Sequence, residues 1–252
     1  MTTGSVVMHL IRFAFPLLLG NLFQQLYNTV DTWVVGNYVS NEAFSAVGSV
    51  TPITNMMIGS FTGLASGAGV VISQYYGAGR ADKVEHTVHT AVSLTLILTV
   101  VFTALGLFIT PYMIGFTQLH EAAAKEAKAY LYIYFAGISG LMIYNMGAGI
   151  LRAIGDSQRP FYFLVVCAVL NTVLDLLFVI AFKMGVEGVA YATILSQYIS
   201  AVLTFVLLFR NRYFLPSETT DNLQLTTAIT IILQEQHSHI KRLPPFLRTM
   251  SL

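Results

Sequence analysis

Long apolar segments alternate with short polar ones along this sequence, at a spacing that fits a series of membrane-spanning helices. Each segment is near or above the roughly 20 residues that an α-helix needs to cross the hydrocarbon core of a bilayer. We therefore predict an all-α, polytopic membrane protein in which residues 1–210 form one lobe of six helices. The predicted spans cover residues 7–38, 51–75, 88–114, 125–151, 160–182 and 187–209, and residues 211–252 form a polar, basic cytoplasmic tail.

The first predicted span carries a polar stripe within its apolar sequence. The members of the stripe are Asn21, Gln24, Asn28 and Asp31. Their spacings of three, four and three residues place all four side chains on one face of a helix. An ionised carboxylate near the bilayer centre costs roughly 2.5–3.5 kcal/mol on insertion scales. We therefore expect Asp31 to face a cavity or another helix, and to handle an ion, a proton or a polar substrate.

A second intramembrane carboxylate lies in the fifth predicted span. Asn171 and Asp175 are four residues apart and therefore lie one above the other on the helix. The sixth span adds three polar side chains on one face, Thr193, Gln197 and Ser200. If both carboxylates face one cavity, with Asn171 and Thr193 as neutral oxygen donors, the group can coordinate Na⁺ or hold a proton. We expect no cofactor beyond this Na⁺ or H⁺, and no other metal.

Composition supports a membrane protein and narrows its partners. Of the 252 residues, 55% are apolar and only 10% are charged, whereas a soluble domain has about 25% charged residues. The net charge of +1 gives no indication of nucleic-acid binding. The single cysteine, Cys167, lies in an apolar run, so no intrachain disulfide is possible. No small-residue cleavage site follows the first apolar run, so we expect the first helix to remain in the mature protein.

Basic residues predict the orientation of the helices. One side of the membrane would hold ten of the 13 basic residues: Arg12, Arg80, Lys83, Arg152, Arg159, Arg210, Arg212, Lys241, Arg242 and Arg248. The other side would hold Lys125, Lys128 and Lys183. Because basic loops stay in the cytoplasm, we predict a plasma (cell inner) membrane protein with both termini cytoplasmic.

Several other features have a structural and a functional interpretation. We expect Gln24, Asn28, Asn145 and Gln197 to line a substrate cavity, although Asn145 is also suited to a hydrogen bond between helices. Tyr130 and Tyr134 are expected to be interfacial anchors. The glycines at positions 59, 63 and 67 predict close helix packing. His86 and His89 share a helix face, but no third ligand lies nearby to complete a metal site.

Six segments resemble the multidrug and toxic compound extrusion (MATE) family, above all its DinF-like and NorM-like members. They are LYNTVDTWVVG (26–36), AVGSVTPI (46–53), QYYGAGR (74–80), LRAIGDSQRP (151–160), LNTVLDLLFV (170–179) and GVEGVAYATILSQ (185–197). The resemblance implies efflux of cationic or amphipathic compounds, driven by entry of Na⁺ or H⁺. It also implies a cation site made of Asp31, Asn171 and Asp175, with Thr193 as a further member.

This sequence departs from the family pattern in length. The family has two lobes of six helices, whereas this chain ends after one lobe and an atypical tail. We expect a truncated amino-terminal half that acts on small molecules in the bilayer and pairs with a second lobe or with its own copy. Two alternatives are a non-functional fragment and a lipid-linked oligosaccharide flippase, which would need more Arg and Lys in its spans. An enzyme is not expected, since H-E-x-x-H and G-x-S-x-G motifs are absent.

Overall fold

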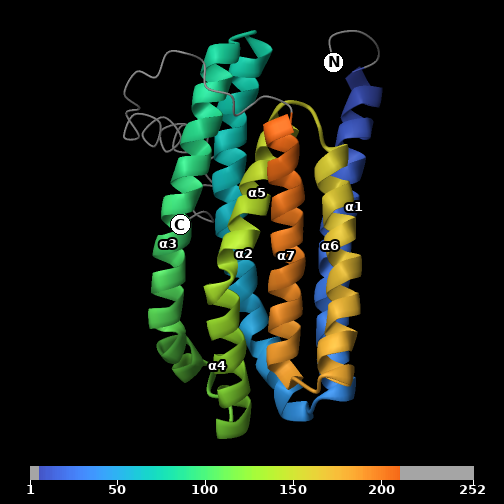
Figure 1. Cartoon of the computed structure of the whole chain (residues 1–252), viewed down its shortest axis with the longest axis vertical. Helices are drawn as coiled ribbons and strands as arrows, with labels where there is room; N and C mark the ends of the chain where they lie inside the picture. The colour runs from blue at the N-terminus through green and yellow to red at the C-terminus, as the bar shows by residue number, and fades with distance from the viewer. Residues whose placement is uncertain (1–5, 211–252) are drawn as a thin grey trace, which may run out of the picture.

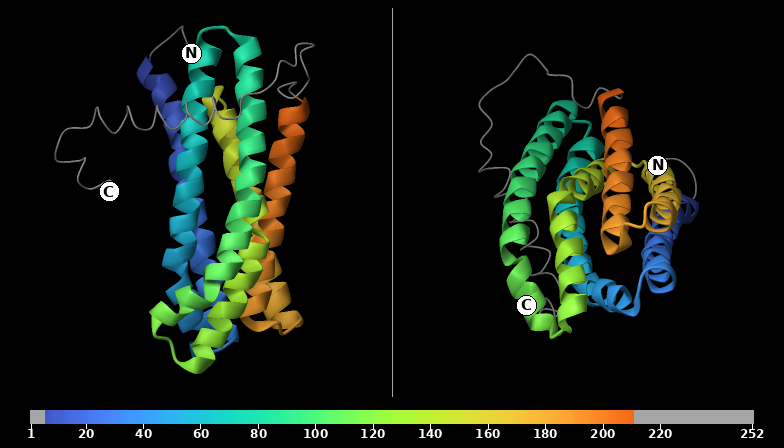
Figure 2. Two further views of the ribbon diagram at one scale, coloured as in Figure 1. Left: turned by 90° about the vertical axis from the view of Figure 1, so that its left-hand side faces the viewer. Right: turned by 60° about the horizontal axis from the view of Figure 1, so that its bottom comes forward.

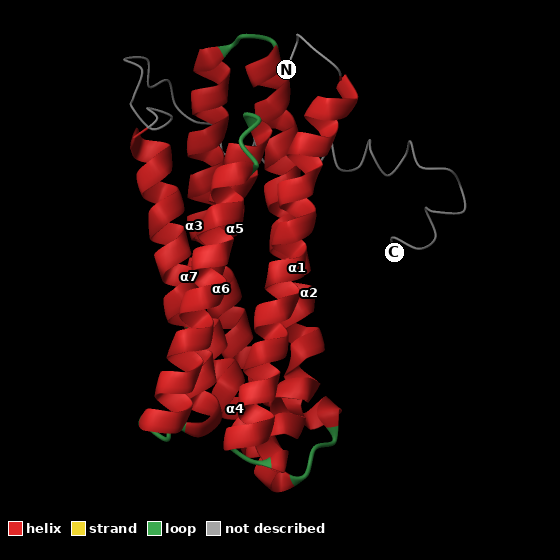
Figure 3. Ribbon diagram, turned by 90° about the vertical axis from the view of Figure 1, so that its right-hand side faces the viewer, coloured by secondary structure: helices red, strands yellow, loops and turns green. Residues whose placement is uncertain are grey.

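The computed structural model describes residues 6–210, and these residues form helices joined by short connections (Figure 3). In chain order the elements are α1 (Val6–Tyr38), α2 (Asn41–Gly77), α3 (Ala81–Thr117), α4 (Glu121–Ala136), α5 (Ile138–Ala153), α6 (Gln158–Leu176), the π-helical turn η1 (Leu177–Ala181) and α7 (Gly185–Arg210). No strand occurs within this described range. The predicted all-α fold is confirmed, and the predicted tail lies outside the described residues.

Most of these helices are long and apolar enough to cross a membrane. Within residues 6–210, four helical segments meet this condition alone: α2, α3, α6 with η1, and α7. The pair α4 and α5 meets it as one span that bends by 50°. Helix α1 has 33 residues but also carries the polar stripe, and it is not among these segments. The polytopic architecture is therefore confirmed, with four or five of the predicted spans supported by length and composition.

The fourth predicted span is broken, which the sequence analysis did not anticipate. Helix α4 ends at Ala136, and α5 starts at Ile138 after Gly137. A Cβ atom on Gly137 would lie only 2.4 Å from the side chain of Ile194 on α7. The missing side chain therefore lets the chain approach α7 closely at the bend. The prediction of one continuous helix over residues 125–151 is wrong for this reason.

The start of α2 also differs from the prediction. The helix begins at Asn41 rather than Thr51, because Ser40 caps it. The Ser40 hydroxyl oxygen accepts a hydrogen bond from the backbone N–H of Ala43 at 3.1 Å. Such a cap satisfies one of the free N–H groups at a helix start. Pro52 is accommodated inside the helix.

The helices pack as an upright bundle (Figures 1 and 2), in which α5 and α7 pack closely against each other. Helix α6 packs against α1 and α7, while α2, α3 and α4 pack together on the other side of α5. The start of α1, the α2–α3 turn, the α5–α6 loop and the end of α7 lie at one end of the bundle (Figure 1). This arrangement matches the predicted segregation of the basic loops. Which end faces the cytoplasm stays a prediction.

Two of the three predicted glycines, Gly59 and Gly63, do not lie at close helix contacts. A Cβ atom on Gly59 would meet no atom within 4 Å, so this residue does not mediate tight packing. The close approach of α2 to α5 occurs instead near Gly149, where a Cβ would lie 3.0 Å from the carbonyl oxygen of Ala65. The expectation of a packing face around Gly59 is therefore wrong, and the contact lies nearer the carboxyl end of α2.

We expect Gly106→Ala to destabilise the bundle. An alanine Cβ there would lie 2.2 Å from the ring of Phe135, which is 1% exposed and has no room to move. Overpacking of this kind costs about 1–3 kcal/mol, more than the gain of about 0.5–1 kcal/mol from replacing a helical glycine. Thermal melting of the purified protein in detergent should show the loss. The matched control, Gly59→Ala, should melt at the same temperature or slightly higher, and equal melting of both variants would contradict this packing.

Candidate functional site

Three helices bring the predicted cation-binding residues together. Asp31 comes from α1, Asn171 and Asp175 from α6, and Thr193 from α7, and all four side chains are at most 4% exposed. The Thr193 hydroxyl lies 3.3 Å from Asp31 Oδ2 and donates to it, while the Asn171 amide lies 3.5 Å from the Thr193 oxygen. The Asp31 and Asp175 carboxyl groups are close enough to interact electrostatically. Residues up to 162 positions apart in the chain therefore meet in one buried cluster.

The local sequence explains how these side chains reach the cluster. Asn171 and Asp175 follow one another by a single helical turn, so both point from α6 in the same direction. The Thr193 hydroxyl oxygen also lies 3.0 Å from the Val189 carbonyl oxygen of its own helix, so its one proton is shared between this carbonyl and Asp31, and the side-chain orientation is fixed. Helices α1, α6 and α7 are mutual neighbours, and this packing places the three contributions opposite one another.

Several buried oxygen atoms in the cluster have no hydrogen-bond partner among the described residues. They are Asp31 Oδ1, Asn171 Oδ1, both carboxyl oxygens of Asp175, and the hydroxyl of Tyr134. An unpaired buried polar atom costs about 1–3 kcal/mol, and more when it is charged. Such a set of oxygen acceptors has the chemistry of a site for a hard cation or a proton.

Tyrosine side chains surround the acidic pair, and sequence reasoning missed their role. Tyr130 and Tyr134 are 7% and 3% exposed, and their rings stack with centroids 6.2 Å apart. Tyr130 interacts electrostatically with both carboxyl groups, and Tyr27 interacts with Asp31. The expectation that Tyr130 and Tyr134 anchor the protein at the membrane surface is therefore wrong. Tyr27 could have been identified from the sequence, because it precedes Asp31 by one helical turn.

A cavity of about 620 Å³ opens beside this cluster, between α1, α2, α5, α6 and α7. Three of the four predicted substrate-lining residues line it, namely Gln24, Asn145 and Gln197. Asn28 is not among the lining residues. Asn21, from the same polar stripe, and Tyr27 do line it. Because Tyr27 also neighbours Asp31, this phenol connects the cavity with the acidic cluster.

Asn145 links two helices and also lines the cavity, while its contact with a substrate stays a prediction. Its Oδ1 accepts a hydrogen bond of 3.4 Å from the Thr62 hydroxyl, which links α2 with α5. Its amide also donates to the Leu141 carbonyl at 2.8 Å. The side chain nevertheless lines the cavity, so a bound molecule would meet an amide that α2 already holds in place.

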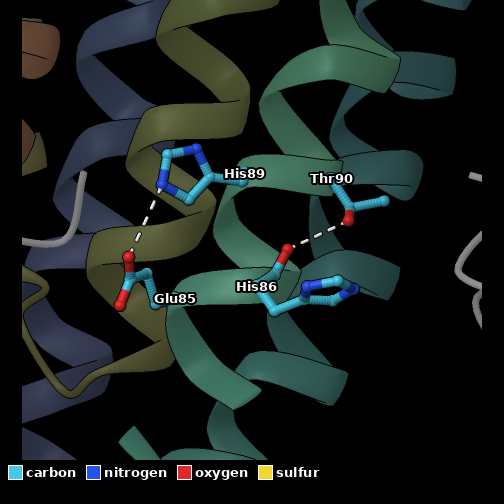
Figure 4. Close-up of polar contacts among 4 residues, drawn as sticks. All are labelled: Glu85, His86, His89 and Thr90. Carbon is cyan, nitrogen blue, oxygen red and sulfur yellow. Dashed lines mark hydrogen bonds and ion pairs between the residues drawn. The ribbon is translucent and has the colours of Figure 1, made fainter. Parts of the chain in front are cut away.

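The histidines of α3 do not form a metal site in the described structure. His89 Nε2 lies 4.0 Å from Glu85 Oε1, and the His86 ring points in a different direction (Figure 4). Within residues 6–210, no group of three or more His, Cys, Asp or Glu side chains could hold a metal ion. The Glu85–His89 pair is thus a contact along one helix, one turn apart.

Comparison with known proteins decides the family. Residues 16–177 match the MatE family model. The chain belongs to the MatE family. Members of this family are transporters rather than enzymes, so MatE membership also confirms the absence of an enzymatic role. The matched range includes Asp31, Asn171 and Asp175, whereas Thr193 lies beyond it.

The MatE relatives include bacterial multidrug resistance proteins. The probable multidrug resistance protein YpnP of Bacillus subtilis is 34% identical over 196 residues, which cover 78% of this chain and 44% of YpnP. The probable multidrug resistance protein NorM of Thermotoga maritima is 30% identical over 209 residues, covering 81% of this chain and 45% of that protein. The chain therefore spans about half the length of the curated relatives it matches.

Solved MatE-type structures share this fold. A MOP superfamily transporter from Pyrococcus furiosus matches with a TM-score of 0.81 at 28% identity, covering 91% of this chain and 52% of that chain. A crystal structure of a MATE protein in a bent conformation matches with a TM-score of 0.79 at 26% identity, covering 94% and 55%. The predicted transporter lobe is confirmed by these matches.

Proposed function

We propose that this chain forms one lobe of a secondary transporter that exports cationic or amphipathic compounds in exchange for Na⁺ or H⁺. The observation that carries the proposal is the buried cluster of Asp31, Asn171, Asp175 and Thr193 with its unpaired oxygen atoms. The names of the multidrug resistance relatives support export of drug-like molecules.

The cluster fits two coupling ions. Na⁺ would take oxygen ligands from the carboxylates, the Asn171 carbonyl and the Thr193 hydroxyl. Two carboxylates this close in a low-dielectric interior repel each other when both are ionised, so a single proton would relieve the same repulsion. In either case the local charge changes by one unit when the ion binds or leaves.

Such a change of charge can be coupled to transport. A transporter alternates between conformations, and an ion shifts the balance only if it binds one conformation better than the other. Because the carboxylates come from α1 and α6, loading the site favours packing of these two helices, and emptying it opposes that packing. The adjoining cavity would change with them, since both helices line it.

The cavity suits the proposed substrates. Its volume of about 620 Å³ lies within the roughly 300–1,000 Å³ of pockets that hold drug-sized molecules. Amide groups of Gln24, Asn145 and Gln197 provide neutral polar contacts among apolar and aromatic walls. Tyr27 lines the cavity and also lies near Asp31. A change in the charge of the acidic cluster would therefore reach the bound molecule through Tyr27.

We further propose that the lobe works with a second lobe or a second copy of this chain, in the plasma membrane with both termini cytoplasmic. The support is the length of its relatives, of which this chain spans about half, and the segregation of basic residues between loops. In a complete transporter, the substrate path would then be shared between two lobes.

The proposal is tested by drug-resistance rescue in efflux-deficient cells. We would compare the chain alone, the chain fused to a second lobe, and an empty vector, and measure growth in a cationic drug together with retention of a cationic dye. We expect the fused form to restore resistance and to lower dye retention. A fused protein that reaches the membrane yet leaves both measures at the empty-vector level would contradict export.

A further inference from the structure

One end of the cavity contains a charged side chain, that of Arg152, which takes no part in the proposed ion exchange. Arg152 is the only charged residue among the described residues that line the cavity. It lies in the last turn of α5, near the α5–α6 loop. The acidic cluster lies beside the cavity, near Tyr27, and neither Asp31 nor Asp175 lines the cavity wall. The cavity therefore has a positive group of its own.

The side chain of Arg152 extends along the cavity instead of leaving it. Long side chains on a helix lean toward the amino-terminal end of that helix. Arg152 accordingly interacts electrostatically with Tyr144, two turns earlier on α5. Tyr144 also lines the cavity, and its hydroxyl donates to the carbonyl of Pro160 at 3.0 Å. The guanidinium thus lies near Tyr144, which contacts the start of α6, and the residue is half-buried.

No described residue satisfies this guanidinium. The ion pairs within residues 6–210 are Arg159 with Asp156, at 3.3 Å, and His89 with Glu85. Arg152 takes part in neither, and its side chain donates no hydrogen bond to a described residue. A basic residue in the last turn of a helix is favoured by the helix dipole, which explains why arginine is tolerated here. The dipole leaves the five N–H donors of the guanidinium available.

Two serine side chains lie with Arg152 in this part of the cavity. Hydroxyl groups of Ser73 and Ser157 line the same end of the cavity, and no carboxylate does so among the described residues. A concave, partly dry site with one sign of charge concentrates ligands of the opposite charge. Apolar walls continue from this end along Leu17, Phe161 and Leu164.

We propose that Arg152 recognises an anionic group, and that the cavity binds amphipathic molecules that carry one carboxylate or phosphate. The inference rests on the proposed function in one respect, since it takes this cavity as the substrate site. The planar guanidinium would hold one such group with two parallel hydrogen bonds. A single arginine matches a single anionic group, whereas a pyrophosphate would require several basic residues. The apolar body of the ligand would lie along α1 and α6, and a cationic end would point toward Tyr27.

Binding of a matched pair of fluorescent probes tests this inference on the full chain in detergent micelles. Dansylglycine carries a carboxylate, and its methyl ester has the same body without the charge. We expect the purified protein to bind the acid at least about tenfold more tightly than the ester, as for a charge-assisted hydrogen bond. Arg152→Gln should bring both affinities to one value, and Arg152→Lys should keep part of the preference.

Arg159→Gln is the matched control. Arg159 lies seven positions after Arg152, but it is exposed and is paired with Asp156. It should keep the full preference for the acid. Equal binding of acid and ester by the unaltered protein would overturn the inference, as would an unchanged preference in Arg152→Gln. If Arg152→Gln does not fold, as judged by thermal melting, the unaltered protein and Arg152→Lys still decide the matter.

Two sources of the anionic group are distinguished by competition. Displacement of dansylglycine by phosphatidylglycerol but not by phosphatidylcholine would identify a lipid headgroup at Arg152. Displacement by neither lipid would identify a free amphiphile as the ligand. The binding test and the export test can fail independently. If the protein prefers the acid but exports nothing, the transport proposal alone is rejected. If it exports without preferring the acid, the Arg152 proposal alone is rejected.

Discussion

Asp31→Asn should reduce cation-driven export by about 5- to 150-fold, the range expected when a coupling free energy of about 1–3 kcal/mol is lost. The amide has nearly the shape of the carboxylate, so the helices should still pack. It cannot take up or release a proton, and it supplies no negative charge to Na⁺. Because the buried cluster contains two carboxylates and no described cationic side chain, loss of either charge removes half of the attraction for the ion. Asp175→Asn should therefore have an effect of the same size.

Dye efflux from energised cells, driven by an imposed Na⁺ or proton gradient, measures this effect. The transporter form that restores resistance would carry each substitution, and its amount in the membrane would be matched by immunoblot. Asp82→Asn is the control, because Asp82 is an exposed acid in the first turn of α3 and belongs to neither the cluster nor the cavity. Full efflux by both Asp31→Asn and Asp175→Asn would reject the assigned site.

The buried acidic residues could be selected from the sequence by their positions within apolar helical segments. Within an apolar segment, a carboxylate is costly enough that its position implies a buried partner, and this argument selected Asp31 and Asp175. Asn171 followed from its position one turn from Asp175. The sequence supported only the hypothesis that these residues share one cavity with Thr193, and the family resemblance implied the same set. The packing of α1, α6 and α7 brings all of them together.

Other parts of the site depend on tertiary contacts that spacing does not encode. Tyr130 and Tyr134 lie near one end of their span, where aromatic residues usually meet the membrane surface. The bend at Gly137 instead turns α4 against α2, α3 and α7, and both rings become buried. That bend depends on the contact between Gly137 and Ile194, which are 57 positions apart. Arg152 was likewise predicted as a topological charge that could also hold its loop to other helices. Its place in the cavity follows from the packing of α5 against α2 and α6.

Asn171→Leu and Thr193→Val should distinguish sodium coupling from proton coupling. Both substitutions keep the approximate volume and remove a neutral oxygen, while the carboxylates remain. Na⁺ needs several oxygen ligands at once, so a sodium-coupled transporter should require at least about tenfold more Na⁺ for half-maximal efflux, the factor that corresponds to about 1.4 kcal/mol. A proton needs only a carboxylate. A proton-coupled transporter should therefore keep its pH-driven efflux within about threefold of the unaltered protein, a change below 1 kcal/mol.

Thr172→Val provides the matched control for Thr193→Val. Thr172 lies beside Asn171 on α6, but its hydroxyl donates to the Ala168 carbonyl at 3.0 Å and lies outside the acidic cluster. Removing this hydroxyl should leave the half-maximal Na⁺ concentration unchanged. The two threonines are comparable because the hydroxyl of each lies 3.0 Å from a carbonyl oxygen of its own helix, that of Ala168 for Thr172 and that of Val189 for Thr193. The two threonines thus differ in the contacts that Thr193 also makes with Asp31 and Asn171. An equal shift in both variants would mean that the hydroxyls act on helix geometry, and the neutral ligands would then have no direct role in holding the ion.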